Sequence, residues 1–214
     1  MKIVKVKKCG RNRVEILFDN DKNAALAYEV FLKNQLKLNQ EISEEFLSFL
    51  FDEDQKYQVK QSALNYLARR QHSKSEIKTK LRQKKFDKTL VELTLDELEQ
   101  NYYVDDRSFA KLFTDEKVKA KNWGKNKIKS ELIKRGVSSK IIAEVIEEKF
   151  SNDLEIESGL ELARKKLKKL INRKLDQKKI QTSIYSFLVS RGYDYDLCKQ
   201  IFTKLFNNEE LGDL

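Results

Sequence analysis

A helix–turn–helix pattern that occurs three times in this 214-residue chain constrains its fold more than any other feature. In each occurrence two apolar residues four apart precede a turn, a capping residue follows the turn, and further apolar pairs come at identical offsets. The matching positions are Ile77, Leu81 and Asp87; Ile128, Leu132 and Ser138; and Ile184, Leu188 and Asp194. Self-similarity at a nearly fixed length is typical of repeat proteins. We therefore expect an extended stack of similar units.

The turn in each occurrence combines residues with separate physical roles. Gly136 and Gly192 stand where the chain leaves a helix, a position that favours the left-handed conformation that glycine adopts without steric cost. Ser138 and Asp194 follow two residues later and can accept hydrogen bonds from the first amides of the next helix. Lys85 occupies the glycine position of the first occurrence. We expect that turn either to be built differently or to carry about 1 kcal/mol of strain.

Composition agrees with a mainly helical chain that has much surface. The chain has no proline, which suits long helices because an internal proline breaks them. Its hydrophobic content of 40% supports only a lean core, and 36% of its residues are charged. The predicted fold is mainly α: an elongated, right- or left-curved stack of three tandem three-helix repeats, with a small β-hairpin-containing N-terminal extension.

The N-terminal extension shows a different periodicity from the repeats. Alternating apolar residues at 3–6 and 14–18 flank a polar turn at 9–12, which predicts a β-hairpin. Residues 24–28 suggest a short third strand, and the longer period over 29–36 suggests a short helix.

Helix boundaries follow from capping residues and apolar stripes. We expect one helix to open at Ser43 and another to span about 55–70; a third follows a capping box at 73–76, and a fourth spans 88–102 with a break at Thr94. The expected helix caps further along are Asp105, Asn152-Asp153 and Asp176. The predicted domains are 1–45 for the extension, 46–104 for the first repeat with its lead-in helix, 105–151 for the second repeat, and 152–214 for the third repeat and C-terminal tail.

Positive charge is concentrated in the first two helices of each repeat. The chain carries a net charge of +10, and its lysines and arginines crowd into 60–88, 117–140 and 164–179. Bands at the same place in stacked units suit a polyanion, with nucleic acid as the first candidate. The candidate contact residues are Arg69, Arg70, Lys74, Lys78, Lys80, Arg82, Arg107, Lys121, Lys125, Lys127, Lys129, Lys134, Arg135, Lys165, Lys166, Lys169, Arg173 and Lys174.

Residue types that carry catalysis or metal binding are scarce. His72 is the sole histidine, and Cys9 and Cys198 stand far apart in no metal-ligand spacing. The sequence has no GxxxxGK[ST] loop for a nucleotide, no signal peptide and no long apolar run. We expect a cytoplasmic protein that is not an enzyme and has no catalytic residues, cofactor or metal.

Several aromatic and acidic residues admit two interpretations. Trp123 lies among lysines and could stack on a base, although packing at a helix junction beside Gly124 is favoured. Packing is also favoured for Tyr102 and Tyr103. The run at 105–107 is interpreted as a helix cap, with a partner contact through its arginine as the alternative.

Four segments read ALNYLARR at 63–70, YVDDRSFA at 103–110, ELIKRGV at 131–137 and FLVSRGY at 187–193. Together they resemble the RecX family, regulators of the RecA recombinase. Each motif is short, but their order and spacing are specific, and the resemblance covers about 57–206. The N-terminal hairpin resembles an extension found on longer members of that family.

The resemblance implies a non-enzymatic protein that binds the RecA filament on single-stranded DNA. In that family, binding along the filament groove generally inhibits recombinase activity, strand exchange and repressor cleavage. The implied partners are the RecA filament and single-stranded DNA, with duplex DNA as an open alternative, and we expect a monomer that has no membrane partner.

Two other classes of function stay open from the residues alone. A helix-turn-helix regulator of duplex DNA would need a recognition helix, yet the helices that follow the turns carry apolar pairs suited to burial. An α-solenoid scaffold for another protein partner is the second alternative.

Overall fold

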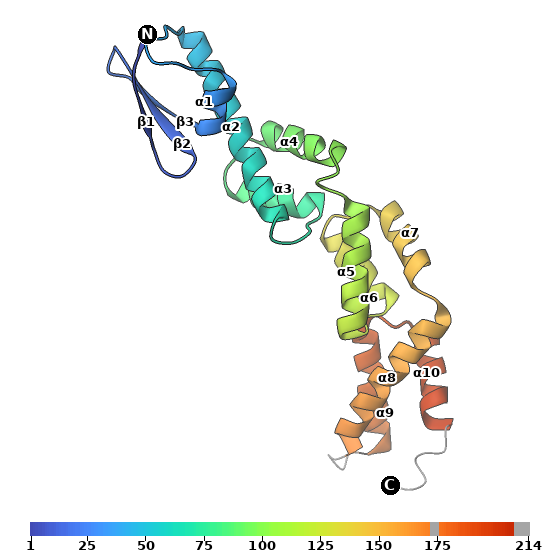
Figure 1. The fold of residues 1–214 in the computed structure, drawn as a ribbon. Helices are drawn as coiled ribbons and strands as arrows, with labels where there is room; N and C mark the ends of the chain where they lie inside the picture. Colours follow the sequence, from blue (N-terminus) through green and yellow to red (C-terminus); the bar gives the residue numbers. More distant parts are fainter. Residues whose placement is uncertain (172–175, 208–214) are drawn as a thin grey trace. The chain divides into compact units, whose positions relative to one another are not determined.

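The computed structural model describes residues 1–171 and 176–207, which form a three-stranded sheet followed by helices (Figure 1). Three tandem three-helix repeats follow the sheet, so the predicted fold class is confirmed. The elements are β1 (Ile3–Lys8), β2 (Arg13–Phe18), β3 (Asn23–Ala27), α1 (Tyr28–Lys33), α2 (Glu44–Leu67), α3 (Lys74–Gln83), α4 (Lys88–Gln100), α5 (Asp106–Lys121), α6 (Lys125–Lys134), α7 (Ser139–Lys149), α8 (Asn152–Ile171), α9 (Gln177–Arg191) and α10 (Tyr195–Asn207).

The chain divides into two compact units. The first contains residues 1–72 and 77–104, and the second contains residues 73–76 and 105–214. The first unit therefore holds the sheet and most of the first repeat. The second unit holds the second and third repeats together with the four residues around the start of α3.

The N-terminal sheet confirms the predicted hairpin and third strand. Its strands are antiparallel in the order β1-β2-β3. Alternate side chains of β2 and β3, among them Ile16, Phe18 and Leu26, are buried on one face. They pack with Leu50 of α2 and Val30 of α1, so these two helices cover the apolar face of the sheet.

One buried carboxylate closes the β3 edge of the sheet. Asp54 of α2 accepts hydrogen bonds from the Ala27 backbone N–H (2.6 Å) and from Gln58 (2.6 Å), and it forms an ion pair with Arg13 (3.0 Å). The Arg13 guanidinium also donates to the Ala25 carbonyl. Two outward backbone groups of β3, the Ala27 N–H and the Ala25 carbonyl, therefore have partners from within the same unit.

The lead-in helix and the first helix of the first repeat are one continuous helix, α2. The prediction of separate helices opening at Ser43 and near residue 55 was wrong, because nothing between them breaks a helix. The N-terminal half packs with the sheet, whereas Val59 and Ala63 belong to the core of the repeat. The predicted break at Thr94 was also wrong: α4 is uninterrupted and Thr94 is buried.

The apolar positions shared by the repeats form their cores. All six second-helix anchors are fully buried: Ile77, Leu81, Ile128, Leu132, Ile184 and Leu188. Each anchor pair packs with apolar residues of the other two helices of its own repeat, as the periodicity predicted. Burying a side chain of this size contributes roughly 1.5–3 kcal/mol before the entropy of folding is counted.

The capping residues after the turns act as predicted. The side chains of Asp87, Ser138 and Asp194 accept the backbone N–H three residues on, at 2.9, 3.4 and 2.9 Å respectively. In the third repeat one predicted cap was wrong, because Ser151 rather than Asn152 caps α8. Asp176 is the N-cap residue of α9, as predicted, although its side chain makes no capping hydrogen bond.

A left-handed glycine turn joins the third repeat to the second. Gly192 has φ +99° and lies against the first turn of α6, where the Gly124 N–H donates to the Arg191 carbonyl (2.9 Å) and the Asn126 N–H to the Gly192 carbonyl (3.2 Å). The Lys125 N–H donates to a Glu155 carboxylate oxygen (3.2 Å). Acceptors of the third repeat thus satisfy the unpaired amides at the start of α6.

The same arrangement occurs a second time within the second unit. Gly136 has φ +73° and lies against Ser75, and the Ser73 hydroxyl donates to the Arg135 carbonyl (2.6 Å). The Lys74 N–H donates to an Asp106 carboxylate oxygen (2.8 Å), as the Lys125 N–H does to Glu155. The repeats therefore share their contact geometry as well as their cores.

The first turn keeps the same backbone without a glycine. Lys85 has φ +63°, close to that of Gly136, so the expectation of mild strain is correct and a differently built turn is not. A non-glycine residue in this region costs about 1 kcal/mol.

We predict that replacing Gly192 with alanine will destabilise the second unit by about 3 kcal/mol. The substitution adds the left-handed penalty to a collision of Cβ with the Lys127 amide and with the Gly124 carbonyl at 2.9 Å. Urea denaturation followed by circular dichroism measures the loss. Gly10→Ala is the matched control, because Gly10 has φ +73° with nothing within 4 Å of its Cβ, and it should cost only about 1 kcal/mol. Equal losses would contradict the packing argument.

The opposite change in the first turn should stabilise the protein. We expect Lys85→Gly to raise the free energy of unfolding by up to about 0.5 kcal/mol, since it removes the left-handed penalty but adds chain entropy to the unfolded state. Lys85→Ala serves as the control, because it deletes the charge and keeps the penalty. The prediction is wrong if both variants change stability alike.

Candidate basic contact surface

Many of the predicted contact residues form ion pairs within their own unit. Glu92 of α4 forms ion pairs with Lys78 (2.6 Å) and Arg82 (2.9 Å). Lys125 forms ion pairs with Asp194 (3.1 Å) and Glu155 (3.7 Å). The others with acidic partners are Arg107, Lys134, Arg135 and Lys165. Their positive charge is offset locally by a carboxylate.

Four other predicted residues lie over aromatic rings. Lys80 lies over Tyr66 (5.0 Å to the ring centroid), Lys121 and Lys127 lie over Trp123 (5.2 and 5.8 Å), and the fourth, Lys166, lies over Phe187 (5.4 Å). An aromatic face attracts a cation through its quadrupole without supplying a negative charge. The ring therefore positions each ammonium group while its full positive charge stays available to a polyanion.

The remaining predicted residues are distributed along the helices. Arg69, Lys129 and Lys169 are exposed and form no ion pair within the part of the chain described here. Arg70 follows α2 and donates to the Gln71 carbonyl, and Lys74 begins α3. Arg173 and Lys174 lie outside the described residues.

Sequence reasoning missed several cations that lie over aromatic rings. Lys84 shares Tyr66 (5.2 Å) and Arg191 shares Phe187 (5.0 Å), whereas Lys117 lies over a further ring, Phe113 (5.3 Å), and also pairs with Glu116. The signal for Lys117 and Arg191 was a basic residue four positions after an aromatic on one helix, which places the two side chains on the same face. In every repeat at least one ring holds two cations: Tyr66, Trp123 and Phe187.

Trp123 has the packing role that the sequence favoured. Its ring packs against Phe113 (6.3 Å between centroids) at the edge of the core of the second repeat, and it remains half-buried. Lys121 and Lys127 lie over the ring, which therefore positions two positively charged groups. Asp105 is likewise the predicted helix cap, accepting from the Arg107 and Ser108 amides.

The expectation that Tyr102 and Tyr103 pack inside the protein was wrong. Tyr102 is 88% exposed and has φ +60°, and Tyr103 is 60% exposed. The chain ends α4 with a left-handed residue, as at the other turns, and this conformation directs both rings to solvent.

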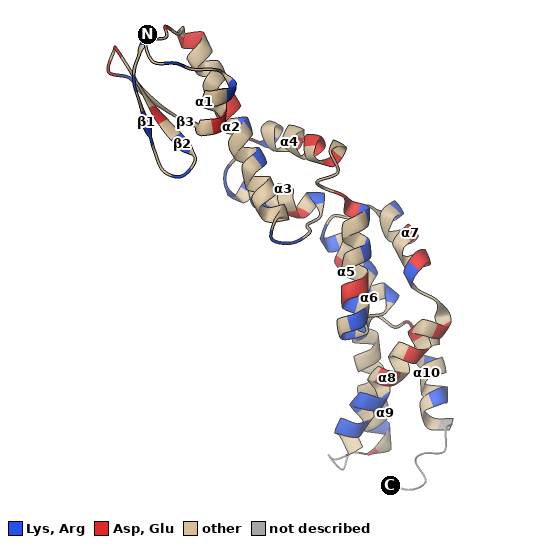
Figure 2. Cartoon of the chain, viewed as in Figure 1, with Lys and Arg blue, Asp and Glu red and all other residues tan. Residues whose placement is uncertain are grey.

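Charge is segregated along α8 (Figure 2). Acidic residues occupy its N-terminal half and basic residues its C-terminal half, an order that favours the helix dipole. The basic half carries Arg164 and Lys165 together with three of the other lysines: Lys166, Lys168 and Lys169. By contrast, the exposed residues of α7 include Glu147 and Glu148.

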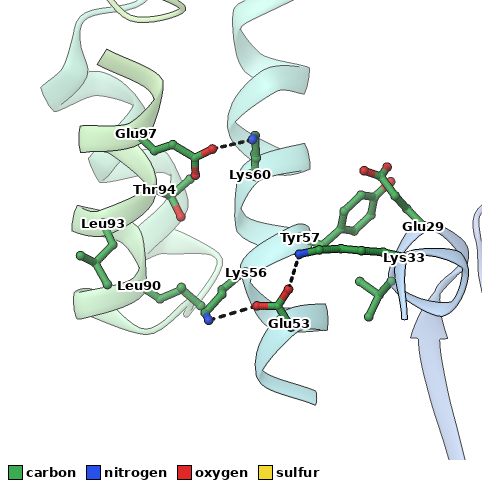
Figure 3. Close-up of a pocket in the computed structure, with 11 residues that line it drawn as sticks. Glu29, Lys33, Glu53, Lys56, Tyr57, Lys60, Leu90, Leu93, Thr94 and Glu97 are labelled. Carbon is green, nitrogen blue, oxygen red and sulfur yellow. Dashed lines mark hydrogen bonds and ion pairs between the residues drawn. The ribbon is translucent and has the colours of Figure 1, made fainter. Parts of the chain in front are cut away.

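The first unit has a groove of about 340 Å³ between α1, α2 and α4 (Figure 3). Its charged side chains pair with one another: Glu53 lies between Lys33 (2.7 Å) and Lys56 (3.1 Å), and Lys60 pairs with Glu97 (2.6 Å). The hydrogen bond from Lys33 lowers the pKa of Glu53, with Lys56 adding to the effect. These pairs fasten α1 and α4 to α2, and they do not present a general acid or base.

Two glutamates of the second unit show opposite electrostatics. Hydrogen bonds from Arg135 and Lys134 lower the pKa of Glu131 to about 2. Burial raises the pKa of Glu155, although hydrogen bonds and charge from Lys125 oppose that rise. Glu131 is thus a firmly ionised anchor for two predicted contact residues, and Glu155 is a buried acceptor at the repeat junction.

Comparisons with known proteins agree with this architecture. Models of the RecX family match residues 60–98, 105–146 and 153–202 as its first, second and third three-helix domains. Proteins named Regulatory protein RecX from Clostridioides difficile strain 630 and Clostridium botulinum strain Eklund 17B are 32% and 30% identical to this chain. Each alignment covers 97% or 96% of both proteins.

Two solved structures share the fold. One, described as regulatory protein RecX, has a TM-score of 0.74 at 22% identity and covers 94% of this chain and 98% of its own. RecX from Lactobacillus salivarius has a TM-score of 0.64 at 22% identity and covers 71% and 97%.

Three tandem three-helix repeats define a modular helical protein, and the relatives that match it over nearly their full length are named as regulatory proteins. The family matches and the full-length relatives then make the assignment specific: this chain belongs to the RecX family. Within the described ranges, none of the helices has the length and apolar character needed to span a bilayer.

The low pKa of Glu131 predicts a defined acid dependence of stability. A lowered pKa in the folded state contributes stability above the ordinary glutamate value of 4.5, and this contribution is lost as pH falls towards about 2. We expect Glu131→Gln to cost about 1–3 kcal/mol at pH 7, with the difference from the parent protein shrinking through that window. Urea titrations between pH 7 and pH 2.5 measure it. Glu157→Gln, at an exposed site on α8, should show a small and flat difference; a flat difference for Glu131→Gln would refute the prediction.

Proposed function

We propose that this protein is a non-enzymatic inhibitor of the RecA recombinase. It binds the RecA filament on single-stranded DNA through basic side chains and lowers the ATPase, strand-exchange and coprotease activities. The observation that carries this proposal is the set of cations held over Tyr66, Trp123 and Phe187, which places un-neutralised charge in every repeat.

The physical basis is electrostatic attraction by a pre-positioned surface. A lysine that is already ordered over a ring loses less side-chain entropy on binding than a freely rotating one. Among the described residues no carboxylate forms an ion pair with it, so it can displace counterions from a phosphate or pair with an acidic group. Membership of the RecX family supports RecA as the protein component of the target.

The action follows from binding alone. A bound monomer that occupies a filament would restrict nucleotide turnover and access of a second DNA strand, and no chemistry on the part of this chain is required. Because RecA filaments form on chromosomal DNA, we place the protein in the cytoplasm.

A role as a sequence-specific reader of duplex DNA has less support. Ile142 and Val145 of α7 and Leu197 and Ile201 of α10 are buried, so the apolar faces of the turn-following helices are used in packing. The exposed glutamates of α7 would repel phosphates.

The proposal predicts inhibition of the RecA ATPase on single-stranded DNA. Addition of this protein at less than one molecule per RecA subunit should lower the steady-state rate, and raising the salt concentration should weaken the effect steeply. An unchanged rate, together with tight binding to one defined duplex, would favour a transcriptional regulator. An unchanged rate without binding to either DNA or filaments would favour a scaffold role.

A matched pair of variants assigns the effect to ring-supported charge. Lys121→Glu/Lys127→Glu reverses both cations over Trp123, and we expect the half-inhibiting concentration to rise at least about tenfold. Lys140→Glu/Lys199→Glu makes the same change in net charge at exposed sites on α7 and α10 and should shift it less than about threefold. Equal shifts would mean that only net charge matters.

A further inference from the structure

The β1 strand has an open outer edge over its second half. Cys9 donates its N–H to the Arg13 carbonyl, so Cys9, Lys7 and Lys5 direct their backbone groups towards β2 in this register. The N–H and C=O groups of Val6 and Lys8 therefore point away from the sheet. In the described ranges they have no backbone partner.

The chain itself closes parts of the rest of the sheet edge. Asp54 and Arg13 occupy outward groups of β3, at the Ala27 N–H and the Ala25 carbonyl. At the start of β1, Ile3 exchanges hydrogen bonds with Asn39 (2.8 Å) and Gln40 (2.9 Å). Open strand edges favour aggregation, so proteins usually cover or charge them. Here the open stretch is short and lies beside lysines.

The side chains along the open stretch form a cationic rim. Lys5, Lys7 and Lys8 are exposed, and among the described residues none of them forms an ion pair. Val6 is half-buried against the core and presents an apolar surface on the other face. The open edge thus offers two backbone N–H donors and two C=O acceptors, from Val6 and Lys8. It also offers a row of positively charged side chains and one apolar side chain.

The positive charge of these lysines determines which kind of strand can pair with the open β1 edge. A second copy paired through β1 would bring lysines opposite lysines, and like charges directly across a strand pair are destabilising. An acidic strand would instead gain charge-assisted pairing along with its backbone hydrogen bonds.

We propose that the β1 edge binds an extended acidic peptide of a partner protein by strand addition. Val6 and Lys8 pair with the backbone of the peptide, which extends the sheet by one strand. Acidic side chains at alternate positions of the peptide meet Lys5 and Lys7, and the intervening apolar side chains meet Val6. About five peptide residues span the open stretch at roughly 3.4 Å each. This inference does not depend on the proposed inhibition of RecA.

Fluorescence anisotropy with the full-length protein tests the proposal. The probe is a fluorescein-labelled peptide of alternating glutamate and valine, six residues long, titrated at low salt. We expect saturable binding. A peptide of the same sequence with N-methyl groups on alternate amides keeps the charge but cannot complete the strand pairing, and it should bind at least about tenfold more weakly.

Protein variants distinguish peptide binding at the β1 edge from nonspecific electrostatic attraction to the basic protein. Lys5→Glu/Lys7→Glu should weaken binding at least about tenfold, whereas the matched Lys168→Glu/Lys169→Glu change on α8 should leave it within about twofold. Val6→Pro removes an outward donor and should abolish binding, with circular dichroism confirming the fold. If Val6→Pro fails to fold, the N-methylated peptide decides. Equal binding of the N-methylated peptide, or equal losses in the two double variants, would overturn the proposal.

Discussion

The contact between a left-handed glycine turn and the first turn of another helix is the constraint on which the repeat architecture depends. Without a Cβ at Gly192, the carbonyls of Arg191 and Gly192 come close enough to accept the first amides of α6. A helix start has amides that no residue of its own helix can satisfy, and here another turn supplies the acceptors. Gly136 meets residues 73–76 in the same way. One turn geometry therefore ends a helix, starts the next with a cap, and joins successive modules.

The basic side chains differ in the group that each of them contacts, which is either a carboxylate or an aromatic ring. Carboxylates hold Lys78, Lys125 and Arg135 and use their charge inside the fold. Aromatic rings position other cations, notably those over Trp123 and Phe187, and do not neutralise their positive charge. The lysines and arginines thus include an acid-paired group and a ring-supported group, and Arg135 belongs to both because its guanidinium also lies over Phe113 (4.5 Å to the ring centroid). Only the ring-supported group, together with exposed unpaired residues, suits the proposed contact with a polyanionic filament.

Periodicity and turn chemistry allowed much of the fold to be predicted. The buried anchors such as Ile128 and Ile184, the left-handed glycines and the capping residues all depend on local sequence, which is why they could be found. The continuity of α2 could not, because a helix that serves both the sheet and a repeat changes its buried face midway along its length. The partners of the cations were also inaccessible, since Glu92 or Trp123 reaches a given lysine only through tertiary packing. Tyr102 and Tyr103 were misjudged because aromatic residues usually pack, whereas a left-handed turn directs these rings outward.

Chemical labelling of lysines tests whether the ring-supported cations, rather than the acid-paired ones, contact the filament. The protein is treated with an amine-reactive reagent alone and when bound to RecA filaments on single-stranded DNA, and the modified residues are quantified by mass spectrometry. We expect Lys121, Lys127 and Lys166 to lose reactivity on binding, while Lys111 and Lys149, which pair with acids of α7 and α5, do not change. Protection of the acid-paired lysines with continued labelling of the ring-supported ones would contradict this expectation.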